Sequence, residues 1–225
     1  MFELEGVRKT YRSGSQRILA LNNFSLKINP KDYIAIVGPS GAGKSTLLHI
    51  IGGLEAPTEG EVKFQGRDIY RMSDKELSFW RNKSVGFVFQ FYHLIEELNI
   101  LDNVAVAAIS LKRKYALKTA HRLLEYLGIQ ERALFFPSQL SGGERQKVAI
   151  ARALINEPDF ILCDEPTGNL DKLSQEKVMG LLEKLNRELG KTIIVVTHNL
   201  DLSRRAGRIL FLESGSLSLD KSFGW

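Results

Sequence analysis

The sequence predicts a single α/β domain in which a parallel sheet carries two additions, a smaller antiparallel sheet and an insertion of helices. Short apolar runs predict buried strands at 34–37, 85–89, 160–163 and 193–196, and helix-like patterns follow most of them. Shorter alternating segments occur in the first thirty residues and at 60–69. From about residue 91 to residue 155 the apolar positions have helical periodicity.

The alternating segments at the start of the chain, and "GEVKFQGRDI" at 60–69, have turn residues between them. Alternation with a period of two, interrupted by turns, is typical of half-buried strands joined by hairpins. These segments therefore predict a partly antiparallel sheet beside the main one.

A glycine-rich loop follows the first buried run. The stretch "GPSGAGKS", 38–45, fits the P-loop pattern and lies between the strand "YIAIV" and the helical "STLLHIIGGL". Gly38, Gly41 and Gly43 allow a tight loop whose amides turn toward phosphate oxygens, where the dipole of the following helix adds favourable potential. Lys44 is expected to reach the terminal phosphates, and Ser45 to offer its hydroxyl to magnesium. A turn without a ligand would not require Lys and Ser directly after the last glycine.

Polar side chains follow the other buried runs. Asp164 and Glu165 end "FILCDE", Gln90 follows "VGFVF", and His198 follows "TIIVVT". Open α/β sheets bind ligands beyond the carboxyl ends of their strands, so these side chains should lie near the phosphate loop. Because successive strand residues face opposite ways, we expect Asp164 to hold the magnesium shell and Glu165 to orient or deprotonate the attacking water. Taken singly, the carboxylates could be a solvated strand end and His198 a structural histidine.

The helical block contains an unusual helix start, "LSGGERQ" at 140–146. Ser141 and Glu144 have the spacing of a capping box. Capping does not account for Gly142 and Gly143, which each cost about 1 kcal/mol relative to alanine inside a helix. Because glycines leave backbone NH groups accessible at the positive end of a helix, the stretch also predicts contact with an anion.

Length and composition predict one domain over residues 1–225, since the chain has 225 residues and 44% hydrophobic content. Within it we expect a core made of 1–90 and 156–225 and a helical subdomain at 91–155. Gly128 is placed as a helix stop, and Pro137 begins the next segment. The sequence has no internal repeat, low-complexity tract or sustained heptad pattern.

The composition also restricts the setting. Cys163 is the single cysteine and lies in an apolar run, which predicts a buried thiol in a reducing compartment. No segment reaches the roughly 18 apolar residues of a membrane helix, so we expect any membrane role to depend on a partner. The net charge of +5 could suit anionic lipid or nucleic acid, but Lys and Arg are spread along the chain and only "KRKYALK" at 112–118 is dense. Solubility explains the charge as well.

With these motifs in this order, the chain resembles the ATP-binding cassette (ABC) ATPases, the motor subunits of ABC transporters, along essentially its whole length. "GPSGAGKS" resembles Walker A, Gln90 the glutamine of the Q-loop, "LSGGERQ" the signature, "FILCDE" Walker B, and "GNLD", ending at Asp171, the D-loop. The resemblance implies a P-loop fold with a RecA-like core sheet, ATP and Mg²⁺ as ligands, and ATP hydrolysis. It also suggests that Tyr11 stacks on adenine, although this aromatic could equally pack or lie exposed in a turn.

The resemblance carries over a set of site residues. We expect Glu165, His198 and Lys44 to be catalytic and Ser45, Gln90 and Asp164 to hold the metal. The expected nucleotide-binding residues are Tyr11, Gly38, Pro39, Ser40, Gly41, Ala42, Gly43, Lys44, Ser45, Thr46, Gln90, Ser141, Gly142, Gly143, Glu144 and Asp171. In the family the signature of one cassette closes over ATP held by the Walker A loop of a second, so the resemblance implies that "LSGGERQ" acts in trans.

The family resemblance implies partners as well. It implies a homodimer on ATP binding that drives a separate integral membrane subunit from the cytoplasmic face of the inner membrane, with no direct contact to the transported substrate or to nucleic acid. We expect residues 90–101 to form the docking surface, because the resemblance places the Q-loop where the core meets the helical block. Phe91, Tyr92 and Leu94 within it could instead belong to the core.

Within the family, "QFYHLIEELNILDNV" and "DEPTGNLD" resemble the branch of lipoprotein-releasing LolD, macrolide-exporting MacB and cell-division FtsE ATPases, and we rank LolD first. That branch often has a proline where this chain has Glu96 and Glu97, which leaves partner and cargo open. The alternatives are an FtsE-like cell-division ATPase, a soluble nucleic-acid-associated ATPase and an adaptor with little hydrolysis. Nucleic-acid relatives separate Walker A from the signature by long coiled-coil arms, whereas Ser45 and Leu140 lie an ordinary domain length apart. Glu165 and His198 argue against the adaptor.

Overall fold

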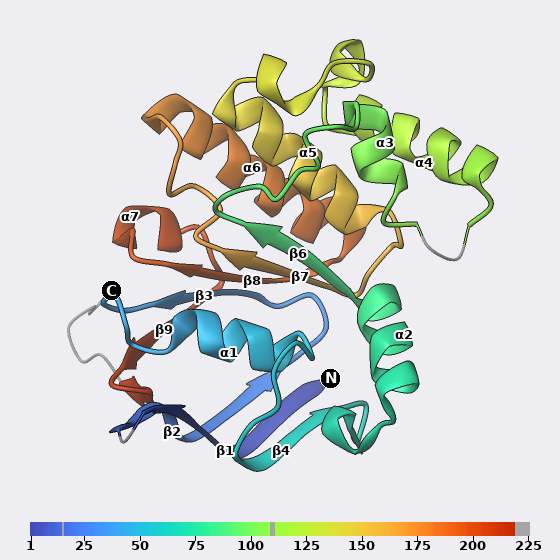
Figure 1. Ribbon diagram of the computed structural model, residues 1–225. Coiled ribbons are helices and arrows are strands. Elements are labelled where there is room, and N and C mark those ends of the chain that lie inside the picture. The colour runs from blue at the N-terminus through green and yellow to red at the C-terminus, as the bar shows by residue number, and fades with distance from the viewer. Residues whose placement is uncertain (15, 109–110, 219–225) are drawn as a thin grey trace.

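The computed structural model describes residues 1–14, 16–108 and 111–218, and a six-stranded sheet forms its centre (Figure 1). Its strands are β3 (Tyr33–Val37), β6 (Val85–Phe89), β7 (Phe160–Asp164), β8 (Thr192–Thr197), β9 (Arg208–Glu213) and β10 (Ser216–Ser218). The order across the sheet is β10-β9-β3-β8-β7-β6; β10 is antiparallel to β9, and the other pairs are parallel. The four predicted buried runs are β3, β6, β7 and β8, which confirms the parallel sheet.

A second, four-stranded sheet has the order β2-β1-β4-β5, and all its pairs are antiparallel. Its strands are β1 (Phe2–Ser13), β2 (Gln16–Ile28), β4 (Glu59–Phe64) and β5 (Arg67–Asp68). The antiparallel sheet is confirmed, but β1 and β2 have 12 and 13 residues where the sequence predicts shorter segments. The register between them shifts around Val7, and Gly6 and Asn23 nearby have φ of 57° and 49°. These irregularities interrupt the alternation, so each long strand looks like several short ones.

Helix α1 (Lys44–Ile51) lies between the two sheets (Figure 1). Its Leu47 and Ile50 are fully buried in a cluster that also contains Ile34 and Ile36 of β3 and Leu162 of β7. The first turn of α1 is therefore fixed against the carboxyl ends of the central strands.

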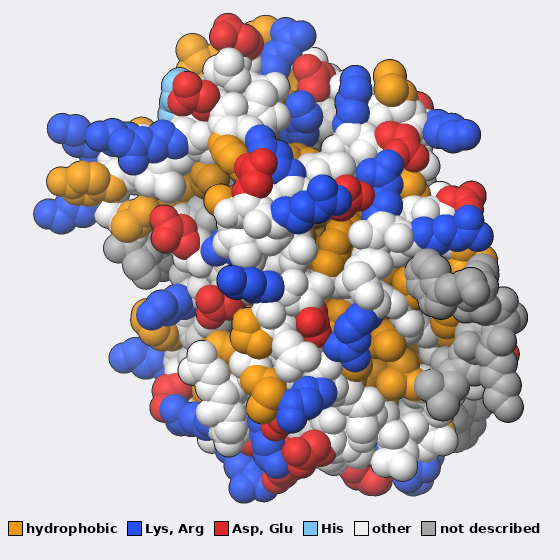
Figure 2. Space-filling model, turned by 180° about the vertical axis from the view of Figure 1, so that it is seen from behind, with side chains coloured by type: hydrophobic (Ala, Val, Ile, Leu, Met, Phe, Trp, Pro, Cys, Tyr) orange, Lys and Arg blue, Asp and Glu red, His pale blue; other side chains and the backbone are white. Residues whose placement is uncertain are grey.

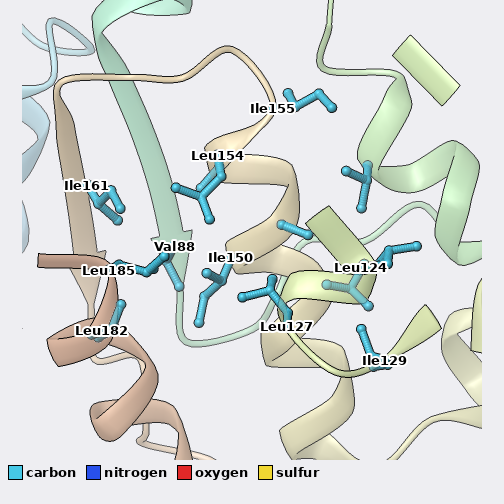
Figure 3. Packing of buried hydrophobic residues seen from close by; sticks show 14 of the residues in the cluster. Val88, Leu124, Leu127, Ile129, Ile150, Leu154, Ile155, Ile161, Leu182 and Leu185 are labelled. Carbon is cyan, nitrogen blue, oxygen red and sulfur yellow. The ribbon is translucent and has the colours of Figure 1, made fainter. Parts of the chain in front are cut away.

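The other face of the central sheet is covered by α5 (Gly142–Leu154) and α6 (Lys172–Leu189), and α4 (Arg113–Tyr126) packs against α5 on the side away from the sheet. Figure 3 shows Ile150 and Leu154 of α5 among Val88 and Ile161 of the strands and Leu124 of α4. All these side chains are nearly inaccessible to solvent. Because α5 packs on both the sheet and α4, it connects the helical block to the core.

The remaining helices are short. They are α2 (Asp74–Ser84), α3 (Ile100–Ala105), α7 (Leu200–Ser203) and the 3₁₀ segments η1 (Ile69–Arg71), η2 (Gln130–Arg132) and η3 (Pro137–Gln139). Gly128, with φ of 64°, follows the end of α4. The helical insertion of the predicted fold is present, while its division from the core at residues 91 and 155 stays a prediction. In the described part of the chain, no helix combines the length and hydropathy that crossing a bilayer requires.

Candidate functional site

The loop between β3 and α1 is held so closely by other strands that glycine is required. Gly41 and Gly43 have φ of 79° and 100°, a region that side-chain-bearing residues rarely adopt. A Cβ atom on Gly43 would lie 2.2 Å from the carbonyl oxygen of Ala20, and one on Gly38 would lie 2.1 Å from that of Leu212. Backbone from β2 and β9 thus fixes the shape of the loop.

The charged and hydroxyl groups at the start of α1 have defined partners. The Lys44 ammonium donates to the carbonyl oxygens of Gly38 (2.7 Å) and Pro39 (2.9 Å), and Lys44 is only 8% exposed to solvent. The Ser45 hydroxyl donates to Asp164 Oδ1 at 3.1 Å. A positive charge and a pair of oxygen ligands therefore lie side by side at the end of β3.

Asp164 is half-buried, and this burial raises the pKa of its carboxyl group, against the lowering effects of the Ser45 hydrogen bond and of the nearby His49 and Lys44. One hydroxyl and one carboxylate fit Mg²⁺, a hard cation that keeps several waters and takes further ligands from phosphates. The described residues contain no cluster of three or more His, Cys, Asp or Glu side chains that could hold a metal without such help. The donor set thus suits a metal that arrives with a nucleotide.

Glu165 lies at a sharp turn after β7. Its φ of 45° is unusual for a residue with a side chain and costs about 1–3 kcal/mol, and its amide donates to the carbonyl oxygen of Val196 at 3.0 Å. Glu165 Oε1 is 2.9 Å from Nδ1 of His198, which follows β8 and is exposed. Oε2 is buried and has no hydrogen-bond partner among the described residues. The hydrogen bond at Oε1 thus orients the carboxylate, and Oε2 remains able to accept a proton or a hydrogen bond.

Gln90 lies against the segment that follows Walker B. Its Nε2 donates to Asn169 Oδ1 at 3.2 Å, and Asn169 Nδ2 donates to the Gln90 carbonyl at 3.3 Å. A Cβ on Gly168 would come within 2.7 Å of Gln90 Nε2. The structure therefore joins Ser45 to Asp164 but joins Gln90 to Asn169, and a role for Gln90 at the metal stays a prediction. Asn169 was missed, although it lies inside "GNLD".

Asp171 caps α6. Its carboxylate accepts from the Ser174 hydroxyl at 2.7 Å and from the Ser174 amide at 3.0 Å, and these bonds lower the pKa of Asp171. This contact fixes the start of α6, directly after the segment that carries Gly168 and Asn169. A nucleotide contact from Asp171 stays a prediction.

Tyr11 is attached to the start of α1 by its hydroxyl. That hydroxyl donates to Glu55 Oε2 at 2.6 Å and lies 3.3 Å from the hydroxyl of Thr46. The Lys9 ammonium lies 5.2 Å from the centre of the Tyr11 ring and 3.0 Å from Glu55. Burial and the Glu55 carboxylate raise the pKa of Tyr11. The ring is thus held beside the phosphate loop; sequence reasoning missed Glu55, which belongs to no motif.

The start of α5 has the predicted capping box. The Ser141 hydroxyl accepts from the Glu144 amide, and Glu144 Oε2 accepts from the Ser141 amide at 2.8 Å. The two glycines also have an explanation within the chain, which the sequence did not reveal. A Cβ on Gly142 would lie 3.0 Å from the Tyr92 hydroxyl, and one on Gly143 would lie 3.1 Å from the Ser174 hydroxyl. Among the described residues, no hydrogen bond joins 140–146 to the phosphate loop of the same chain.

Comparison with known families matches residues 21–168 to the family described as ABC transporter. The lipoprotein-releasing system ATP-binding protein LolD of Wigglesworthia glossinidia brevipalpis is 42% identical over 219 residues, which cover 96% of each chain. The macrolide export ATP-binding/permease protein MacB of Chlorobaculum tepidum is 45% identical over 222 residues, which cover 98% of this chain and 34% of that longer one. Among solved structures, the dimeric post-hydrolysis state of the ATP-binding cassette MJ0796 bound to ADP and Pi is similar at a TM-score of 0.90 and 43% identity, with 100% of both chains covered.

Proposed function

Because the chain belongs to the ABC transporter family and is one of its ATP-hydrolysing subunits, we propose that two copies close around two ATP molecules and thereby move a separate membrane subunit. The observation that carries this proposal is the arrangement at the carboxyl ends of β3, β7 and β8. There the Ser45–Asp164 pair and the Glu165–His198 pair lie next to the phosphate loop. One pair suits a metal and the other suits the activation of water.

We assign the following roles within one chain, which this geometry supports in part. Backbone amides of 38–45 and the Lys44 ammonium bind the phosphates, and the ammonium exchanges its two carbonyl partners for phosphate oxygens. Ser45 and Asp164, with Gln90, hold Mg²⁺, which offsets the negative charge of the phosphates. Glu165 accepts a proton from the attacking water, and His198 keeps Oε1 in place. Tyr11 supports the adenine with its ring.

The second half of each site comes from the other copy. Among the described residues, the signature at the start of α5 makes no hydrogen bond to its own phosphate loop. Its capping box satisfies the Glu144 amide and leaves the amides of Gly142 and Gly143 without a hydrogen-bond partner in the described part of the chain. MJ0796, which is similar along the whole chain, is dimeric. We therefore place Ser141, Gly142, Gly143 and Glu144 on the ATP held by the partner copy.

The membrane subunit docks at residues 90–101 in this proposal. Phe91 and Ile95 are exposed to 68% and 41%, whereas Leu94 packs against the core and Tyr92 is half-buried. Of Phe91, Tyr92 and Leu94, the apolar side chains named in the predicted docking surface, only Phe91 is exposed. Figure 2 shows the molecule from behind. On this face Lys and Arg side chains (blue) are interspersed with Asp and Glu side chains (red), which does not favour a nucleic-acid-binding surface.

The docking surface is tested by replacing its most exposed side chain. Phe91→Asp should abolish co-purification with the membrane subunit, because a carboxylate cannot be buried in an apolar interface without a partner, while basal ATPase activity survives. Leu189→Asp, at an exposed position near the end of α6, is the matched control and should leave co-purification intact. Unchanged recovery of the membrane subunit with Phe91→Asp would count against this surface.

For the cargo, we propose that the complex releases or exports lipoproteins, with this chain bound at the cytoplasmic face of the inner membrane. The support is the resemblance to LolD proteins over nearly the whole of both chains. Purifying the protein from membranes and identifying the subunit bound to it tests the proposal directly. A lipoprotein-releasing permease is the expected partner, and a cell-division membrane protein would contradict it.

A further inference from the structure

The loop that follows Gln90 is strained and is held by α5. Tyr92 and His93 are successive residues with φ of 62° and 49°, a left-handed conformation that non-glycine residues keep only when their surroundings impose it. The guanidinium of Arg152 donates to the carbonyl oxygens of both residues, at 2.6 Å for Tyr92. No carboxylate among the described residues pairs with Arg152. Within the described part of the chain, the side-chain hydrogen bonds of the Arg152 guanidinium therefore all go to the backbone of this loop.

The side chain of Tyr92 faces the other end of the same helix. The Arg145 guanidinium lies 5.6 Å from the centre of the Tyr92 ring, and the Tyr92 hydroxyl fills the space beside Gly142. Nearby, the fully buried Gln146 donates to the carbonyl oxygen of Phe89. The loop thus contacts α5 along the helix, from Gly142 at its first residue to Arg152 in its last turn.

We infer that Tyr92 and Arg152 are positioning residues that fasten this loop to α5, so that a force applied at the exposed Phe91 moves the Gly142 end of the signature. The inference rests on the proposed function for the docking at Phe91 and for the action of the signature in trans. A strained loop held at both ends cannot slide along α5, so the loop and the helix move as one body. Closure over the partner's ATP then depends on what is bound at Phe91.

The first test separates positioning from docking. Arg152→Met, at a position in α5 outside the docking surface, should leave ATP affinity and co-purification with the membrane subunit unchanged, because neither the phosphate loop nor the sequence of 90–101 is altered. The ratio of subunit-stimulated to basal ATPase activity should fall about tenfold, within the usual range of coupling between linked sites. An unchanged ratio of stimulated to basal activity overturns the inference. Co-purification with Phe91→Asp tests the docking surface alone, so the two proposals can fail separately. Arg152→Lys, which keeps the charge but cannot span both carbonyls, should lower the same ratio less than Arg152→Met.

The second test is a double-mutant cycle that needs no membrane subunit. Gly142→Ala brings a methyl group to 3.0 Å from the Tyr92 hydroxyl, and Tyr92→Phe removes that hydroxyl. The change in Tm caused by Gly142→Ala should therefore be more unfavourable in the wild type than in the Tyr92→Phe background. Gly143→Ala, whose methyl group would meet Ser174 instead, is the matched control and should be indifferent to Tyr92→Phe. Additive effects of Gly142→Ala and Tyr92→Phe would overturn the contact on which the inference depends.

Discussion

Removing the Lys44 ammonium should separate ATP binding from folding. In the structure this ammonium holds together the two ends of a strained loop through the carbonyls of Gly38 and Pro39. Lys44→Ala removes both hydrogen bonds, which as charge-assisted bonds are worth about 1.5–3 kcal/mol each, but it also removes the cost of burying a charge. We expect these effects to cancel largely, with a net loss of no more than about 2 kcal/mol. That loss corresponds to a fall in Tm of about 4–8 °C for a domain of this size.

The effect on ATP should be much larger. The same ammonium would make about two charge-assisted hydrogen bonds to phosphate oxygens, so its removal costs about 3–6 kcal/mol of binding. At 1.4 kcal/mol for each factor of ten, affinity falls by about 10² to 10⁴.

Titration of labelled ATP, together with circular dichroism and a thermal melt, measures both quantities on the same sample. Lys75→Ala, at an exposed position in α2, is the control for loss of a lysine and should change neither. A folded Lys44→Ala protein that binds ATP with the affinity of the wild type would refute the assignment of the phosphate loop.

Two further predictions concern the adenine and the metal. If the ring of Tyr11 supports adenine, Tyr11→Phe keeps ATP affinity although it loses the bond to Glu55, and Tyr11→Ala lowers it; equal titration curves for all three proteins exclude stacking. Burial raises the pKa of Asp164 above that of the unfolded chain, so the ionised carboxylate costs stability. This cost begins as pH rises past the pKa of the unfolded chain and is complete above the raised pKa. Asp164→Asn should therefore raise Tm at neutral pH without nucleotide, raise it less in acid, and weaken Mg²⁺-dependent ATP binding. A lower Tm for Asp164→Asn at neutral pH contradicts this sign.

The central strands could be predicted because they are buried on both faces and form continuous apolar runs, as β3 and β8 do. Strand β9 was missed because only Leu212 is buried, while three of its six residues are partly buried and two are exposed, so its pattern is mixed. Helix α2 was missed as well, since few of its residues are buried, although Ser73 and Glu76 form a capping box that could have indicated it.

For the site, the rule that ligands bind at the carboxyl ends of parallel strands is enough to predict that Ser45, Asp164, Glu165 and His198 gather at one edge. The contacts of loops with one another cannot be obtained in this way. The bond from Gln90 to Asn169 joins residues 79 positions apart and depends on how two loops pack. The contact of the Tyr92 hydroxyl with Gly142 has the same origin, so no pattern of spacing in the sequence shows it.

The central claim is that each ATP is enclosed by two copies of the chain, and the association state of Glu165→Gln measured by light scattering tests it most directly. The amide keeps the size of the side chain but cannot take a proton, so ATP should persist and link the copies by mass action. The account predicts a dimer with ATP and Mg²⁺ but not with ADP, and a monomer that still binds ATP when Ser141→Arg is added. A Glu165→Gln protein that stays monomeric at saturating ATP and Mg²⁺, both alone and with its membrane subunit, would contradict the account.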